Sequence, residues 1–236
     1  MTGPNTDILP SSPCCGAKTD NMLHIEQLVY NSFQVNTYLV WDDQGRCMVI
    51  DPAFPPGEET DAFDRMIAER ELTLMGQINT HCHVDHLLGV RHIERHYGFP
   101  LSAHEDEARN LKNAPLMGEI FGLKVESPEG IGRLIRDREE VLLGDNTLLA
   151  LHVPGHSPGS LAYYSEKGRF VVTGDALFQG SIGRTDLPGG DYDQLIAAIR
   201  SQLLTLPPET IVYPGHGPAS TIGEEKDENP FLSMTE

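Results

Sequence analysis

The chain has 236 residues, of which 39% are hydrophobic, so it is long enough to bury a core without disulfide bonds. Its 35 acidic and 17 basic residues give a formal net charge of −18, which disfavours binding to nucleic acid or to an anionic membrane surface. Because the sequence contains no run of about 18 apolar residues and no apolar stretch of a signal peptide, we expect a cytoplasmic protein without a membrane span.

Residues 1–20 carry several prolines and glycines and are predicted to form a disordered tail, followed by a single domain over residues 21–236. The tail holds Cys14 and Cys15, and the domain holds Cys47 and Cys82. Since these four cysteines form no Cys-x-x-Cys pair, we expect no structural zinc site, and their number fits a reducing compartment.

The first part of the domain is predicted to form strands. Segments rich in β-branched and aromatic residues, separated by turn residues, predict three short strands: Ile25–Tyr30, Thr37–Trp41 and Cys47–Ile50. Apolar residues at helical spacing then predict a helix over Asp61–Arg70, and an apolar run predicts a buried strand over Leu74–Asn79.

The second part of the chain alternates between helices and strands. Helices are predicted over Leu87–Tyr97 and Glu105–Lys112, and Pro115–Arg133 is expected to be an irregular loop or lid because it contains several glycines and prolines. A helix over Tyr192–Leu204 is flanked by predicted strands: Val141–Leu143, Thr147–His152, Leu161–Tyr164, Phe170–Thr173 and Thr210–Tyr213. This order predicts an α/β fold in which two mixed β-sheets lie face to face between outer helices, an αββα sandwich.

The strongest chemical signal is the run Thr80–His86, which holds four potential metal ligands within six residues. Because side chains alternate along an extended segment, three of them are expected on one side: His81, His83 and Asp85. Cys82 then points away from that side. His86 stands where the chain turns into a helix, so its side chain can face a second ligand-binding position. Imidazole and carboxylate ligands suit zinc, iron, manganese or cobalt better than calcium or magnesium.

Three further candidate ligands share one local pattern, since each follows an apolar strand and lies beside glycine or proline: His156, Asp175 and His216. Glycine lets the backbone bend sharply, so such turns can bring side chains to a shared edge of a sheet. Each residue alone is weak evidence, but together with the Thr80–His86 run they predict one metal centre.

The full series of seven ligands resembles the metallo-β-lactamase superfamily over nearly all of residues 23–232. Residues 180–186, 221–225 and 229–231 resemble its short branch of hydroxyacylglutathione hydrolases, similar to glyoxalase II. The resemblance implies two divalent metal ions, with zinc expected and iron or manganese as alternatives. It also implies that His81, His83 and His156 bind metal 1. Metal 2 is then bound by Asp85, His86 and His216, and Asp175 bridges the two ions.

The resemblance further implies hydrolysis of a small-molecule acyl thioester such as S-lactoylglutathione. The attacking group would be a metal-bridging hydroxide, because two metal ions lower the pKa of a shared water and polarise a carbonyl. Asp85 and Asp175 would be the catalytic carboxylates. In the resembled enzymes a basic residue nine positions after the bridging aspartate holds anionic glutathione, and Arg184 stands at this position. A surface salt bridge is the alternative role for Arg184.

Several alternatives stay open at the level of sequence. Full-length glyoxalase II carries a helical C-terminal domain with glutathione contacts, whereas about 20 residues follow His216 here, so use of glutathione is undecided. Persulfide dioxygenases of the same fold use one iron, held by counterparts of His81, His156 and Asp175. A nuclease is disfavoured by the charge, and a β-lactamase by the expected cytoplasmic location. Both a monomer and a homodimer are compatible with the sequence.

The remaining polar residues receive simpler interpretations. Cys82 is not expected to be a nucleophile, since it points away and a thiol needs a free base. Asp51, at the end of a strand, is expected to hydrogen-bond a metal-binding histidine. His92 and His96, four residues apart on a predicted helix, are expected to face solvent, with metal binding as the alternative. Three histidines are expected to have no ligand-like neighbours: His24, His104 and His152.

Overall fold

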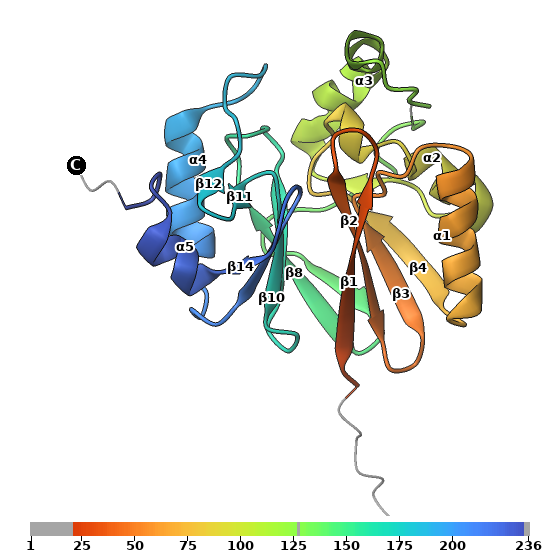
Figure 1. Ribbon diagram of the computed structural model, residues 1–236, viewed down its shortest axis with the longest axis horizontal. Coiled ribbons are helices and arrows are strands. Elements are labelled where there is room, and N and C mark those ends of the chain that lie inside the picture. The colour runs from red at the N-terminus through yellow and green to blue at the C-terminus, as the bar shows by residue number, and fades with distance from the viewer. Residues whose placement is uncertain (1–20, 127, 234–236) are drawn as a thin grey trace, which may run out of the picture.

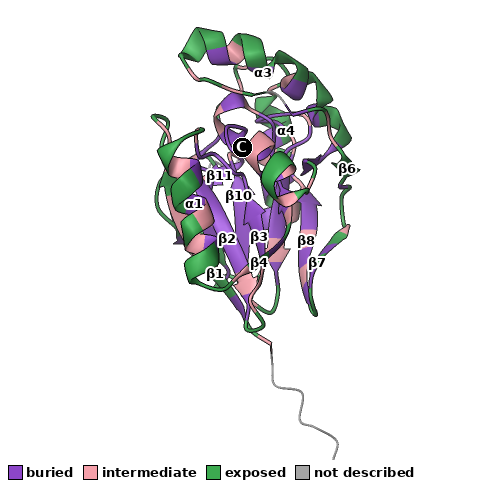
Figure 2. Ribbon diagram, turned by 90° about the vertical axis from the view of Figure 1, so that its right-hand side faces the viewer, coloured by how far each residue is buried: buried purple, intermediate pink, exposed green. Residues whose placement is uncertain are grey.

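Two β-sheets lie face to face, and helices cover the outer face of each sheet (Figure 1). The computed structural model describes residues 21–126 and 128–233, so the tail predicted over residues 1–20 lies outside the described residues. Coloured by burial, the strands form the buried interior, while the helices expose their outward sides (Figure 2). The architecture is the αββα sandwich expected from the order of the predicted elements.

The first sheet has the strand order β1-β2-β3-β4. Its strands are β1 (Leu23–Tyr30), β2 (Val35–Asp42), β3 (Arg46–Ile50) and β4 (Thr73–Ile78). The first three strands pair antiparallel through short turns, whereas β3 and β4 pair parallel and therefore need a crossover. Helix α1 (Glu58–Glu69) forms this crossover and buries Phe63 and Ile67 against the outer face of the sheet.

The second sheet has the strand order β14-β13-β10-β9-β8-β7. Its strands are β7 (Glu140–Leu143), β8 (Asn146–His152), β9 (Leu161–Ser165), β10 (Phe170–Gly174), β13 (Ile211–Pro214) and β14 (Ser220–Thr221). The parallel pair β10–β13 is joined by α4 (Tyr192–Ala198), which continues as the π-helical turn η4 (Ile199–Leu203). Helix α5 (Ile222–Glu228) then begins at a capping box between Thr221 and Glu224.

The main core lies between the two sheets. Tyr38 and Ile50 of the first sheet belong to the same buried cluster as Tyr163, Phe170 and Val172 of the second. Each fully buried apolar side chain of this size stabilises the fold by about 1.5–3 kcal/mol. This core therefore fixes the two sheets against each other, together with the loops at their edges.

The short connecting elements lie around these sheets. They are η1 (Val84–His86), α2 (Val90–His92), η2 (Ile93–Tyr97), β5 (Ser102–Ala103), η3 (Glu105–Glu107), β6 (Arg133–Leu134), β11 (Leu177–Phe178) and β12 (Ser181–Ile182). Among the described residues, no helix combines the length and the apolar character that a membrane span requires.

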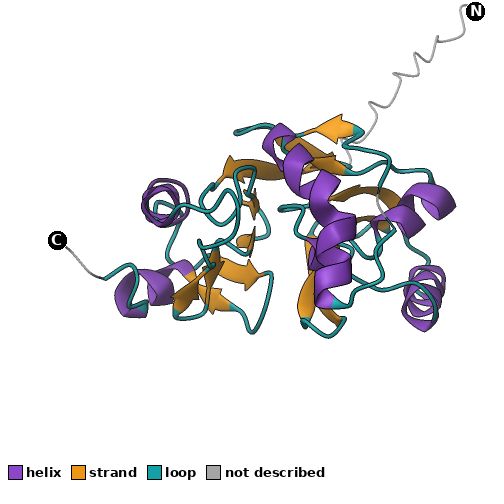
Figure 3. Ribbon diagram, turned by 90° about the horizontal axis from the view of Figure 1, so that it is seen from above, coloured by secondary structure: helices purple, strands orange, loops and turns teal. Residues whose placement is uncertain are grey.

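Helix α3 (Ala108–Phe121) corrects the prediction of an irregular loop over Pro115–Arg133 for residues 115–121, whereas the described residues between Phe121 and Arg133 form no helix or strand, as predicted. Proline removes one backbone hydrogen bond from a helix, but α3 buries Leu111, Ala114 and Gly118 along one side, and this burial outweighs the loss. The helix ends at Gly122, which has a left-handed conformation. Seen from above, α3 lies over the strands (Figure 3), and its Met117 and Phe121 line the same cavity as the candidate ligands His83 and His156.

Candidate metal centre

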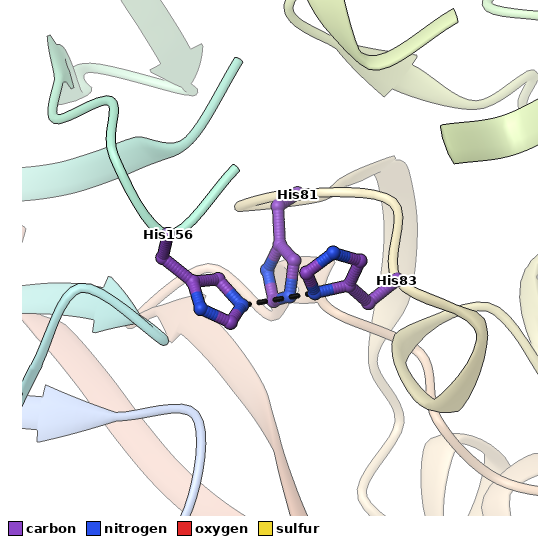
Figure 4. A group of neighbouring side chains, drawn as sticks. All are labelled: His81, His83 and His156. Carbon is purple, nitrogen blue, oxygen red and sulfur yellow. Dashed lines mark hydrogen bonds between the residues drawn. The ribbon is translucent and has the colours of Figure 1, made fainter. Parts of the chain in front are cut away.

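The seven candidate ligands follow four strands and converge on one volume. The run His81–His86 follows β4, and His156, Asp175 and His216 follow β8, β10 and β13. Three of the nitrogen ligands form a first cluster, His81, His83 and His156, in which the potential ligand atoms lie within 4.8 Å of one another. Their rings point toward a common point, and Nδ1 of His83 lies 2.9 Å from Nε2 of His156 (Figure 4).

A second cluster holds Asp85, His86 and His216, whose ligand atoms also lie within 4.8 Å of one another. Asp175 lies between the two clusters. Its Oδ2 is 3.6 Å from Nε2 of His156 and 3.4 Å from Nε2 of His216, and its Oδ1 is 3.5 Å from Nε2 of His86. The structure thus brings together all seven residues singled out in the sequence, in two groups that share one carboxylate.

Three buried atoms of this centre lack a hydrogen-bond partner: Nε2 of His81, Nε2 of His86 and Oδ1 of Asp175. An unsatisfied buried polar atom costs about 1–3 kcal/mol, and folded proteins rarely leave one without a reason. Imidazole nitrogens and carboxylate oxygens that converge on one volume, with these three atoms left without a partner, fit divalent transition-metal ions. The residues present therefore suit two such ions, one for each cluster.

The first cluster favours neutral imidazoles. Burial lowers the pKa of His81 well below its usual range, and burial together with the neighbouring His156 lowers the pKa of His83 to about 4. A histidine must be neutral to bind a metal ion, so these two side chains do not have to release a proton before they bind one near neutral pH.

The second cluster is dominated by carboxylates. Burial alone would lower the pKa of His86, but the negative charges of Asp175 and Asp85 outweigh it and raise that pKa well above its usual range. Hydrogen bonding to Asp175 and Asp85 likewise overcomes burial at His216 and raises its pKa to about 9. This half of the centre attracts positive charge, which a divalent cation would provide.

Glycines allow the close approach of these loops. A Cβ atom on Gly215 would lie 2.0 Å from Oδ1 of Asp175, so no other residue fits directly before His216. Gly155, directly before His156, has a φ of 128°, and a Cβ there would lie 2.4 Å from the backbone nitrogen of Leu195. Both glycines bring a candidate ligand to the centre, as expected from the sequence.

Three ligand histidines are oriented by hydrogen bonds from their other ring nitrogen. Nδ1 of His86 lies 3.1 Å from Oδ2 of Asp51, so the expected contact between Asp51 and a candidate ligand is present. Nδ1 of His156 donates to the backbone carbonyl of Arg184 at 2.8 Å, and Nδ1 of His216 donates to that of Phe33 at 3.0 Å. Such bonds fix the ring and the tautomer, and so direct Nε2 to the centre.

Glu107 is a functional candidate that the sequence did not reveal. Its fully buried carboxylate accepts hydrogen bonds from the backbone of Cys82 at 2.7 Å and from Asn110 at 3.0 Å. It also accepts from the hydroxyl of Ser157 at 2.5 Å and from the backbone of Gly159 at 2.8 Å. Glu107 therefore joins the loop of His81 and His83 to the loop of His156. In the sequence it stands within the acidic run 105–107, which is typical of a solvated surface.

Arg184 lies beside the centre, but its guanidinium is paired. It makes two bonds of 2.7 Å to Asp186, and its side chain is exposed, so the salt bridge considered from the sequence is present. Cys82 points away from the centre into an apolar cluster, as the alternation predicts. Burial, and then the charge of Glu107, raise the pKa of its thiol well above the usual range. A neutral, buried thiol is a poor nucleophile.

Other histidines depart from their expected surroundings. His96 is exposed as expected, but His92 is half-buried and bonds Asp64 at 2.9 Å, because α1 packs beside it. His104 and His152, expected to lack ligand-like neighbours, stack with ring centroids 4.4 Å apart, and Asp106 lies near them. Both groups combine elements distant in the sequence, which explains why local patterns missed them.

A cavity of about 190 Å³ opens onto the metal centre. Its walls combine candidate ligands with Arg184 and with five apolar side chains: Phe33, Val84, Met117, Phe121 and Leu187. A substrate can therefore reach the ligands through a mostly apolar cleft under α3.

Comparisons with known proteins agree with this geometry. The chain is 36% identical to hydroxyacylglutathione hydrolase GloC of Haemophilus influenzae over 213 residues, which are 89% of this chain and 99% of the relative. It is 39% identical to the probable metallo-hydrolase YqgX of Bacillus subtilis over 203 residues, 85% of this chain and 93% of the relative.

Solved structures give the same result. BLEG-1, a B3 metallo-beta-lactamase, superposes with a TM-score of 0.82 at 34% identity, over 89% of this chain and all of that chain. TTHA1623 in a di-iron-bound form superposes with a TM-score of 0.78 at 36% identity, over 88% of this chain and all of that chain. ETHE1 from Myxococcus xanthus superposes with a TM-score of 0.74 at 29% identity, over 90% of this chain and 86% of that chain.

The family assignment rests on both fold and sequence. Residues 30–216, which span the candidate ligands, match the family model of the metallo-beta-lactamase superfamily. With the αββα sandwich and two relatives similar over most of the chain, this protein belongs to the metallo-β-lactamase superfamily.

Proposed function

We propose that the protein is a two-metal hydrolase of small-molecule acyl thioesters, a class that includes S-lactoylglutathione. The observation that carries this proposal is the position of Asp175, whose carboxylate lies within 3.6 Å of histidines from both clusters. A shared carboxylate of this kind is typical of sites with two metal ions. The similarity to GloC, described as a hydroxyacylglutathione hydrolase, supports the thioester as substrate class.

Each candidate ligand has a proposed role. His81, His83 and His156 would hold the first ion, and Asp85, His86 and His216 the second. Asp175 would bind both, and Asp85 and Asp175 would balance part of their charge. Zinc is the proposed metal, with iron or manganese as alternatives, and TTHA1623 shows that a similar chain binds two iron ions. When bound, two such ions supply hydroxide at neutral pH and polarise a carbonyl.

The chain itself would position the substrate and exclude water. His83, His156 and His216 line the cleft, so a thioester carbonyl that enters it meets the centre directly. Phe33 and Phe121 contact each other edge to face at the wall of the cleft, with ring centroids 5.8 Å apart, and would shield the reacting group from solvent.

A persulfide dioxygenase is the second candidate, because ETHE1 from Myxococcus xanthus superposes over 90% of this chain. It would use a single iron held by His81, His156 and Asp175. The shared ligands do not separate this activity from hydrolysis, so the test must compare the two reactions.

The test uses metal-replete protein in two assays. Hydrolysis of S-lactoylglutathione and other acyl thioesters is followed at the thioester absorbance, and oxygen uptake is followed with glutathione persulfide. We expect thioester loss without oxygen uptake. Oxygen uptake with one iron per chain, and no loss of any thioester, would overturn the hydrolase assignment in favour of the dioxygenase.

A further inference from the structure

The cleft beside the metal centre has a continuous apolar wall. Val84, Met117 and Leu187 line both the 190 Å³ cavity and a smaller adjoining cavity of about 50 Å³ under α3. Phe33 and Phe121 extend this wall to the mouth, where 40% and 43% of their surfaces are exposed. Aromatic side chains exposed at the mouth of a cleft are unfavourable in water, unless a ligand covers them.

The wall is held in place by the centre itself. The backbone carbonyl of Phe33 accepts the hydrogen bond from Nδ1 of His216, and the ring of the same residue contacts Phe121. Phe33 therefore links a candidate ligand to the apolar wall, and an apolar group on this wall has a fixed position relative to the reacting atoms.

The cleft offers little to an anionic substrate. Among the described residues that line the two cavities, Arg184 is the only lysine or arginine, and Asp186 already binds its guanidinium with two hydrogen bonds. Glutathione carries two carboxylates, which need positive partners, while the chain as a whole carries a net charge of −18. The walls thus favour a neutral, apolar group over glutathione.

We infer that the cleft binds a short aliphatic acyl chain, so that the preferred substrates are aliphatic acyl thioesters rather than hydroxyacyl thioesters of glutathione. This inference rests on the proposed thioester hydrolysis and specifies its substrate class. Phe121 and Met117 of α3 are the specificity-determining side chains, because in this arrangement they contact the aliphatic acyl chain of the substrate and not its reacting carbonyl.

The experiment compares acyl chains on one neutral thiol. The kcat/KM is measured for the acetyl, lactoyl, butyryl and hexanoyl thioesters of N-acetylcysteamine, and for S-lactoylglutathione. Each buried methylene is expected to raise kcat/KM about fourfold, which gives about a fifteenfold advantage of butyryl over acetyl, since the two acyl groups differ by two methylenes. Phe121→Ala should bring this ratio close to one. Ile120→Ala is the matched control, since Ile120 is the adjacent residue of α3 and is 63% exposed outside the cleft lining.

Two outcomes would overturn the inference and leave thioester hydrolysis intact. One is a preference of the wild-type protein for lactoyl over butyryl on the same thiol. The other is an unchanged chain-length preference in Phe121→Ala.

A binding measurement separates this inference from the proposed function. Calorimetry with the thioether S-hexyl-N-acetylcysteamine, which cannot be hydrolysed, should show binding to the wild-type protein and to Ile120→Ala but about tenfold weaker binding to Phe121→Ala. If no thioester is cleaved and this pattern of binding holds, the hydrolase proposal fails and the apolar subsite stands. If the thioether does not bind to the wild-type protein, the inference of an apolar subsite fails as well.

Discussion

Oε2 of Glu107 accepts a hydrogen bond of 2.7 Å from the backbone N–H of Cys82, which lies between two candidate ligands and 25 residues earlier in the chain. The other carboxylate oxygen, Oε1, binds Ser157 and Gly159, which follow the ligand His156. One fully buried side chain thus holds the spacing between the two loops that form the first cluster. Its negative charge is offset by four donors rather than by a cation.

Glu107→Gln should weaken this cluster while the protein stays folded. The amide has about the same shape, but it must place an N–H₂ group against donors that now bind an oxygen, which costs about 1–3 kcal/mol of stability. Loss of such a support of metal ligands typically lowers metal affinity 10–100-fold. Chelator competition measures the affinity and urea unfolding the stability, with the exposed Glu105→Gln as control. Wild-type metal affinity in Glu107→Gln would contradict this role.

Asp51→Asn tests the orientation of His86. Asp51 has a φ of 50°, a left-handed conformation that asparagine also adopts readily, so the backbone should be preserved. The neutral amide loses the charge that faces Nδ1 of His86 and keeps only one acceptor oxygen for the hydrogen bonds from Thr80 and His86, so we expect a 10–100-fold loss of metal affinity. The exposed Asp227→Asn serves as control, and the two affinities are compared by chelator competition. Equal affinities would show that His86 needs no orienting carboxylate.

Cys82→Ala addresses the alternative of a thiol nucleophile. Because the thiol is buried and its pKa is raised, Ala should cost about 1 kcal/mol of stability through the small cavity it leaves, with kcat/KM close to the wild-type value. The measurement pairs thioester kinetics with metal analysis of the variant. Loss of activity at full metal content would instead assign a chemical role to the thiol.

Asp42 predicts a pH dependence of stability away from the centre. It is buried, and burial alone would raise its pKa, but hydrogen bonds from Arg46 and Asn21 lower it below the usual value. A carboxylate whose pKa is lowered on folding stabilises the protein above its unfolded pKa of about 3.9, and this contribution is lost as the pH falls through the folded pKa.

Asp42→Asn should therefore lower the free energy of unfolding by about 1–2 kcal/mol at pH 7. Urea unfolding between pH 7 and pH 3 should show that the difference from the wild-type protein shrinks as the pH falls. Asp145→Asn is the control, because Asp145 is 79% exposed although it faces the same Arg46 at 3.6 Å, and its effect should stay below about 1 kcal/mol. A difference that stays constant with pH would contradict this account.

The sequence was sufficient for the elements and ligands that local patterns encode. Alternation correctly separated His81 and His83 from Cys82, because side chains of an extended segment point to opposite sides in turn. It did not place Asp85 with them, since Val84–His86 forms the turn η1 and Asp85 lies with His86 and His216. The strands of both sheets were predicted from short apolar runs between turns, except β14, whose residues Ser220 and Thr221 are both polar. Strands β1 and β2 each begin two residues earlier than predicted.

Features that depend on contacts between distant segments could not be predicted. The carbonyl of Phe33 supports His216 across 183 residues, and Glu107 supports Ser157 across 50. Pro115 locally favours a break, and only the packing of α3 over the loops shows why the helix continues through it. The intrinsic preference of a residue for helix or loop is smaller than the free energy gained by such burial. These features are therefore set by the tertiary arrangement of the elements.

The metal content of the purified protein tests the central claim most directly, since the roles proposed for the seven ligands depend on two ions sharing Asp175. Elemental analysis of metal-replete wild-type protein should give two divalent transition-metal ions per chain, and Asp175→Asn should lose metal and activity together. His216→Ala should retain the ion of the first cluster alone. A single ion in the wild-type protein, unaffected by His216→Ala, or full metal content and activity in Asp175→Asn, would contradict the two-metal centre.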